Sequence, residues 1–200
     1  MKKILFLTLL VLSNTVFAKL NFVTTTHMGQ WVLNNKASTL NFITTKNASK
    51  TEIQTFNKLQ GKISGTKVTL TVDLSSVDTG IEIRDERLRE LFFKVAKYPT
   101  ATVTLDIKKN DIYPMKPGQI KTLQLDAEIT IQGVEQTMPV QLQVVELEKN
   151  QRLVFSSEPI IVDLKNFYLL KGVNQLREIA KLKSINTQIP VTFSLLFTKQ

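Results

Sequence analysis

The side chains that could do chemistry in this sequence are few and poorly placed for it. His27 is the single histidine, and there is no cysteine. A Ser-His-Asp triad needs its histidine beside the nucleophile in the fold, whereas His27 lies in a polar segment before the predicted domain. A triad is therefore disfavoured, and cysteine nucleophiles are excluded. Zinc sites built on histidine or cysteine are excluded for the same reason.

Asp73 and Asp78 are the carboxylates closest to an acid/base pair. Asp73 falls on the polar face of an alternating stretch, and Asp78 lies in a segment rich in Ser, Thr and Gly. A solvated strand face and a turn explain these positions better than catalysis does. The sequence also carries no phosphate-binding glycine motif and no calcium-loop spacing. It therefore predicts no catalytic residue, no metal site and no enzymatic cofactor.

The first residues have the three regions of a secretory signal peptide. Lys2 and Lys3 give a basic start, Ile4 to Leu12 are apolar, and Val16-Phe17-Ala18 loosely fits the small-x-small cleavage rule. The alternative is a membrane anchor, but the apolar run is too short to span about 30 Å of hydrocarbon. We expect cleavage after Ala18, export to the periplasm, a loose arm over residues 19–29 and one domain over residues 30–198.

The basic charge gives no sign of nucleic-acid binding. Removing Lys2 and Lys3 lowers the formal charge from +9 to +7, and the remaining basic residues are mostly scattered among acidic ones rather than clustered beside aromatics. The densest basic set is Lys165, Lys171, Arg177, Lys181 and Lys183. That set could lie near anionic lipid head groups. We expect any contact with a membrane to be transient at most.

Most of the mature sequence alternates between apolar and polar residues, which predicts strands with one buried face. Clear examples are 67–74, 101–107, 120–131, 138–148 and 188–197. About eight such strands with short connections indicate an all-β, eight-stranded antiparallel barrel, since closure removes edge strands. A β-sandwich is the structural alternative.

The alternation also predicts which residues face the interior. That set is Phe42, Leu70, Val72, Val103, Leu105, Leu125, Ile129, Leu142, Phe155, Phe193 and Leu195. A barrel of eight strands can be filled by such side chains or can hold one small ligand. Periodicity alone does not decide between a packed core and a ligand cavity.

Two segments change to helical spacing. Arg84 to Lys94 is charged, with Leu88, Leu91 and Phe92 on one side. We expect Arg84 and Asp85 to form a surface ion pair at its start, with a contact to the head group of a bound molecule as the alternative. The second helix is predicted over 175–182, after Gly172 and with Asn174 as its N-cap.

The segment around the first of these helices resembles the YceI-like family of exported bacterial proteins. The matching phrases are Ser76-Val77-Asp78-Thr79-Gly80, Arg84-Asp85-Glu86-Arg87-Leu88, Leu91-Phe92-Phe93-Lys94-Val95 and Tyr98-Pro99, together with Trp31-Val32-Leu33 and Ile129 to Val134. Arg87 stands where the family usually has histidine, and Val162 to Tyr168 keeps only part of a later family phrase, R-x-D-F-G.

The resemblance implies a lipocalin-like barrel that binds a long amphipathic lipid, typically a polyisoprenoid or an isoprenoid quinone. Phe92 and Phe93 would then join the interior set as part of a lid. Such a binding protein needs no catalytic residue, because burying the tail gains roughly 0.8 kcal/mol per CH₂. The resemblance leaves the oligomeric state open, with a dimer among the alternatives.

Two other classes are alternatives to a lipid-binding protein. One is a structural or stress-related envelope protein with a packed barrel core. The other is an outer-membrane barrel, which the charged strand faces and the internal helix disfavour.

Overall fold

The computed structural model describes residues 29–200. The signal peptide, its cleavage site, His27 and nearly all of the expected arm lie outside the described residues, so those expectations stay predictions.

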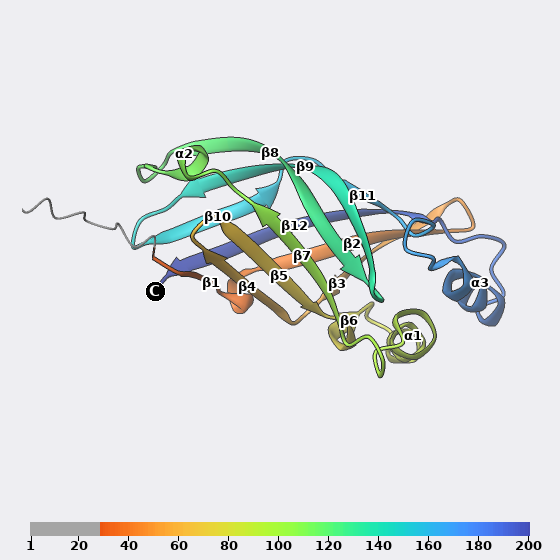
Figure 1. Ribbon diagram of the computed structural model, residues 1–200. Coiled ribbons are helices and arrows are strands. Elements are labelled where there is room, and N and C mark those ends of the chain that lie inside the picture. The colour runs from red at the N-terminus through yellow and green to blue at the C-terminus, as the bar shows by residue number, and fades with distance from the viewer. Residues whose placement is uncertain (1–28) are drawn as a thin grey trace, which may run out of the picture.

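Within this range, twelve antiparallel strands form one continuous sheet that closes on itself. They are β1 (Trp31–Leu33), β2 (Thr39–Lys46), β3 (Lys50–Phe56), β4 (Leu59–Ser64), β5 (Lys67–Asp73), β6 (Val77–Asp78), β7 (Thr100–Asp106), β8 (Ile120–Ile131), β9 (Val134–Glu146), β10 (Gln151–Ser156), β11 (Ile160–Asp163) and β12 (Gln188–Lys199). The ring runs β1-β4-β5-β7-β8-β9-β10-β12 and returns to β1. This is the predicted eight-stranded barrel, and Figure 1 shows it from the side.

The other four strands are β2, β3, β6 and β11. They extend the wall of the barrel beyond short breaks in its strands. β12 pairs with β1 through its last residues and with β2 through Val191–Ser194. On its other edge it pairs with β10 and then with β11. Short irregular segments separate these partners, namely the 3₁₀ turn Asn35–Ala37 and the stretch 157–159, where Pro159 has no N–H to donate. One long strand therefore ties together the first and last parts of the chain.

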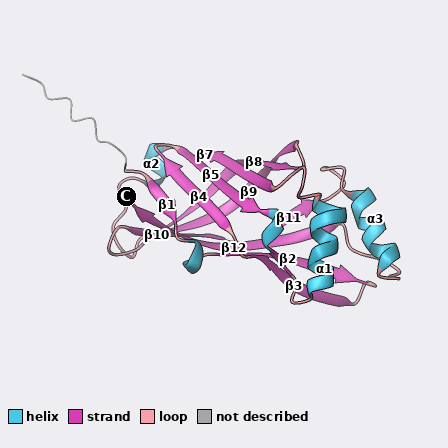
Figure 2. Ribbon diagram, turned by 90° about the horizontal axis from the view of Figure 1, so that it is seen from below, coloured by secondary structure: helices cyan, strands magenta, loops and turns pink. Residues whose placement is uncertain are grey.

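The helices lie at the two ends of the barrel. α1 (Glu82–Arg87) continues into a π-helix (Leu88–Phe93), and together they confirm the first predicted helix. These helices and α3 (Leu170–Ile179) sit at one end, whereas α2 (Lys109–Ile112) lies at the other end near the C-terminus (Figures 1 and 2).

The boundary predicted for α3 is wrong. The helix begins at Leu170, so Asn174 lies inside it and is not an N-cap. The cause is Gly172, which looks like a helix breaker in the sequence but is a packing residue in the fold. A β-carbon there would lie 2.9 Å from Phe92 Cδ2, so glycine allows α3 to approach the π-helix closely.

The phase predicted for β10 is also wrong. Strand alternation places Arg152 and Val154 toward the interior, and Leu153 and Phe155 line a shallow groove on the outer face. Phe155 is therefore not an interior residue. The reason is Arg152, which is 2% exposed, because a buried arginine turns the apolar neighbours of its strand outward.

Arg152 closes the α2 end of the barrel. Its Nε and Nη2 donate to Glu146 Oε2 at 2.7 and 2.5 Å. Its guanidinium lies 4.3 Å from the ring centre of Trp31 and 5.0 Å from that of Tyr113. Trp31 Nε1 in turn donates to the Tyr113 hydroxyl at 2.9 Å. We call these four residues the floor cluster.

We expect Arg152→Met to lower the free energy of unfolding by about 3 kcal/mol, since it leaves the partly buried Glu146 carboxylate without its partner. Adding Glu146→Gln should recover part of that loss. Arg177→Met is the control, because Arg177 pairs with Glu178 at 3.7 Å on the surface and should change stability by less than about 0.5 kcal/mol. Urea denaturation gives the free energy of unfolding of the wild type, the single and double variants at the floor, and Arg177→Met. Equal losses of stability in Arg152→Met and Arg177→Met would contradict a closing role for Arg152.

Candidate functional site

The barrel contains two adjoining cavities with apolar walls. The larger chamber, near α1 and α3, has a volume of about 340 Å³. The smaller chamber lies toward α2 and has a volume of about 130 Å³. Leu40, Val103, Ile129, Val162 and Val191 line both chambers. The two chambers therefore meet at these side chains, along the length of the barrel.

Twelve of the residues predicted for the interior line these chambers. Phe42, Val72, Phe92 and Phe93 line the larger one; Leu70, Leu105, Leu125, Leu142, Phe193 and Leu195 line the smaller one; Val103 and Ile129 line both. Phe155 is the exception noted above. The alternation of the strands was sufficient to find the ten residues that lie on strands, because each faces the interior at a period of two. Phe92 and Phe93 lie on the π-helix and were predicted from the family resemblance.

Aromatic rings form the wall under α1 and the π-helix. The Phe42 and Phe56 rings are 5.1 Å apart, Phe56 and Phe93 are 5.6 Å apart, and Phe93 and Phe92 are 4.8 Å apart. Phe92 and Phe93 are adjacent in sequence, and both are buried. The π-helix ends directly after them, at Lys94, whose backbone is in the left-handed region. Both rings can therefore face the larger chamber.

Sequence reasoning missed the contribution of α3 and its flanking residues. Leu169, Val173, Leu176, Ala180 and Leu182 line the larger chamber. The helical spacing of Leu176 and Ala180 was visible, but nothing in the pattern showed that this face covers the barrel end.

Polar side chains gather at the α1 and α3 end of the larger chamber. We call this group the rim, and its members are Thr44, Lys46, Gln54, Arg84, Arg87 and Asn186. Asn186 is exposed, so the chamber reaches the surface here. By contrast, the smaller chamber ends at Ile112 and the floor cluster.

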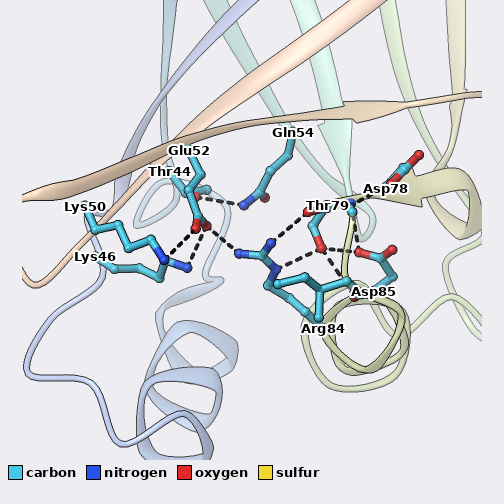
Figure 3. A network of polar contacts seen from close by, with 11 residues as sticks. Thr44, Lys46, Lys50, Glu52, Gln54, Asp78, Thr79, Arg84 and Asp85 are labelled. Atoms are coloured by element: carbon cyan, nitrogen blue, oxygen red, sulfur yellow. Dashed lines mark hydrogen bonds and ion pairs between the residues drawn. The ribbon is translucent and has the colours of Figure 1, made fainter.

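Glu52 organises the rim from just outside the chamber lining (Figure 3). Lys46 Nζ lies 2.6 Å from Glu52 Oε2, and Lys50 Nζ lies 3.3 Å from Oε1. Arg84 Nη1 donates to the same Oε2. The hydrogen bond from Lys46, supported by Arg84 and Lys50, lowers the pKa of Glu52 from 4.5 to about 2 despite partial burial.

The expected surface ion pair between Arg84 and Asp85 is absent among residues 29–200. Arg84 turns to Glu52 and donates through Nε to Thr79 Oγ1 at 2.8 Å. Asp85 is 5% exposed and accepts from the Thr79 backbone N–H at 2.9 Å. These contacts attach the start of α1 to the loop after β6, as Figure 3 shows.

Metal chemistry and membrane-spanning helices find no support within the described range. Over residues 29–200 no cluster of three or more His, Cys, Asp or Glu side chains is placed to hold a metal ion. In the same range, no helix combines the length and apolar character needed to cross a bilayer.

A closed antiparallel barrel around an apolar interior defines the lipocalin-like class of fold. The sequence profile of the YceI-like domain matches residues 31–197. The chain therefore belongs to the YceI-like family, as the sequence motifs indicated.

Solved structures agree with this assignment. A polyisoprenoid binding domain from Saccharophagus degradans implicated in plant cell wall breakdown is 31% identical, with a TM-score of 0.83, over 85% of this chain and 98% of that one. Burkholderia cenocepacia BcnA is 17% identical with a TM-score of 0.62, over 82% and 98% of the two chains. A Campylobacter jejuni YceI protein is 17% identical with a TM-score of 0.54, over 74% and 85%. The last two show likeness of fold alone. No protein of curated function matches this sequence.

The network around Glu52 predicts a pH dependence. A carboxylate whose pKa is lowered on folding adds stability above its unfolded pKa and loses it as the pH falls toward the folded value. Glu52→Gln should therefore be less stable than the wild type at pH 7, and the difference should shrink below about pH 4.5. Urea denaturation from pH 7 to pH 3 measures it.

The control is Thr45→Val, which removes a 2.9 Å hydrogen bond to Thr51 nearby. Neither threonine titrates, so this variant should differ from the wild type by the same amount at every pH. A constant difference for Glu52→Gln would show that the ion pairs add no stability.

Proposed function

We propose that this protein binds a long-chain amphipathic lipid, of the polyisoprenoid or isoprenoid-quinone type, inside its barrel and carries or stores it. The observation that supports this most directly is the pair of adjoining chambers. The larger one lies within the 300–1,000 Å³ range of small-molecule sites, and protein interiors otherwise hold few voids larger than a water molecule. Membership of the YceI-like family and likeness to a polyisoprenoid binding domain support the same ligand class.

The two ends of the barrel differ in polarity, and this difference indicates which way round such a lipid would lie. The rim is polar and reaches the surface, whereas the smaller chamber is apolar up to the floor cluster. An amphipathic molecule would place its head group at the rim and its tail past Val103 toward Leu125. Burial of the tail supplies the binding free energy, so the proposed activity is binding without catalysis.

Val103→Trp tests this function, since Val103 lies where the chambers meet. We expect the indole to fill the junction, so that the purified variant loses the hydrophobic ligand that native mass spectrometry should detect on the wild type. Thr102→Trp is the matched control, because the side chain of the preceding residue faces outward on the same strand. It should keep the ligand.

The alternative is an envelope protein with a packed barrel core. In that case the wild type would carry no ligand, and the tryptophan at residue 103 would cost about 1–3 kcal/mol of stability through overpacking.

The proposed site of action is the periplasm, after cleavage of the signal peptide. Expressed with its own N-terminus, the protein should appear in the periplasmic fraction with Lys19 as its first residue. Ala18→Trp should leave an uncleaved precursor, because the cleavage site needs a small residue. N-terminal sequencing distinguishes the two forms, and a wild-type protein that starts at Met1 in the cytoplasm would contradict export.

A further inference from the structure

The charged side chains that line the larger chamber are all cations. They are Lys46, Arg84 and Arg87, and no Asp or Glu of residues 29–200 joins them in the lining. A chamber with apolar walls and charge of one sign at its open end attracts the opposite charge, and the low-dielectric walls strengthen that attraction.

Glu52 compensates only part of this charge. Its Oε2 is shared by Lys46 and Arg84, and its Oε1 is also close to Lys50. One carboxylate therefore faces three cations before Arg87 is counted. The same three cations, Lys46, Arg84 and Lys50, lower the pKa of Glu52.

Of the three cations in the chamber lining, Arg87 is the one without a partner among residues 29–200. Arg84, Arg89, Arg152 and Arg177 each lie within ion-pair distance of a carboxylate. Arg87 is half-buried against the larger chamber and makes no side-chain hydrogen bond or ion pair with any residue of the described part of the chain. Its guanidinium is therefore free to donate to a ligand.

We propose that the rim selects a lipid with an anionic head group, a phosphate or a carboxylate, and that Arg87 is the residue that binds it. A guanidinium matches the oxygens of either group through two parallel hydrogen bonds. Leu88 and Phe92 follow on the same helical segment and line the chamber, so a head group at Arg87 leaves the tail among these apolar side chains. A neutral head group, such as an alcohol or a quinone, would leave the charge of Arg87 uncompensated. This proposal rests on the proposed function and narrows it, because an anionic head group favours a polyisoprenoid phosphate or carboxylate over an isoprenoid quinone.

The test uses three probes with the same C20 tail: geranylgeraniol, geranylgeranyl monophosphate and geranylgeranoic acid. Isothermal titration calorimetry should show that the wild type binds at least one of the anionic probes about ten-fold or more tightly than the alcohol. Arg87→Gln should remove most of that preference, because it weakens binding of the anionic probes far more than binding of geranylgeraniol, whereas Arg87→Lys should restore part of it.

Arg89→Gln is the matched control. Arg89 lies two residues further along, its guanidinium pairs with Glu82, and it does not line the chamber. This variant should keep the wild-type preference, and circular dichroism should show that all variants are folded.

The outcomes separate the two proposals. A preference for the phosphate, the carboxylate or both supports an anionic head group and identifies which anion. Equal binding of all three probes, or an unchanged preference in Arg87→Gln, overturns the role of Arg87 and leaves lipid binding intact. Failure of every probe to bind, while the wild type purifies without lipid, overturns both proposals.

Discussion

The pairing of β12 along both of its edges is the constraint on which this structure depends. Its last residues bond to β1 and β10, and its first residues bond to β2 and β11. Without those bonds the sheet would have two open edges and no enclosed interior. The breaks in the neighbouring strands let the wall bend around the chambers while β12 stays continuous, so the backbone closure and the cavity are the same feature of the fold.

The two ends of the barrel differ in their balance of charge. At the floor, the buried Arg152 and the partly exposed Glu146 form a pair of no net charge, and Trp31 and Tyr113 lie against the guanidinium. At the rim, Glu52 is outnumbered by the cations around it. Burial explains the difference: an unbalanced charge is very costly in a dry interior, but water screens it at a surface. An uneven charge is therefore tolerated at the rim, which reaches the surface, and would be costly at the floor.

The sequence predicted the barrel and the first helix, and twelve of its thirteen candidate interior residues line the chambers. Ten of these lie on strands, where strict alternation indicates which face is buried. It failed where one residue had a role that its type does not reveal. Arginine is rarely buried, so its residue type gave no sign that Arg152 faces the interior, and its burial reversed the phase expected for Phe155. Gly172 looked like a breaker, yet its contact with Phe92 places it inside α3. The contacts of Glu52 with Arg84 join segments distant in sequence, and no local pattern encodes such pairs.

The pairing of Trp31 with Lys199 also has a consequence for how the molecule forms. The first strand of the barrel can be bonded on both sides only after the last strand has been synthesised. Hydrogen bonds between such distant segments make folding slow, because a long loop must close before they form. A nascent chain that lacks β12 therefore cannot close the barrel, whichever of its other strands have already paired.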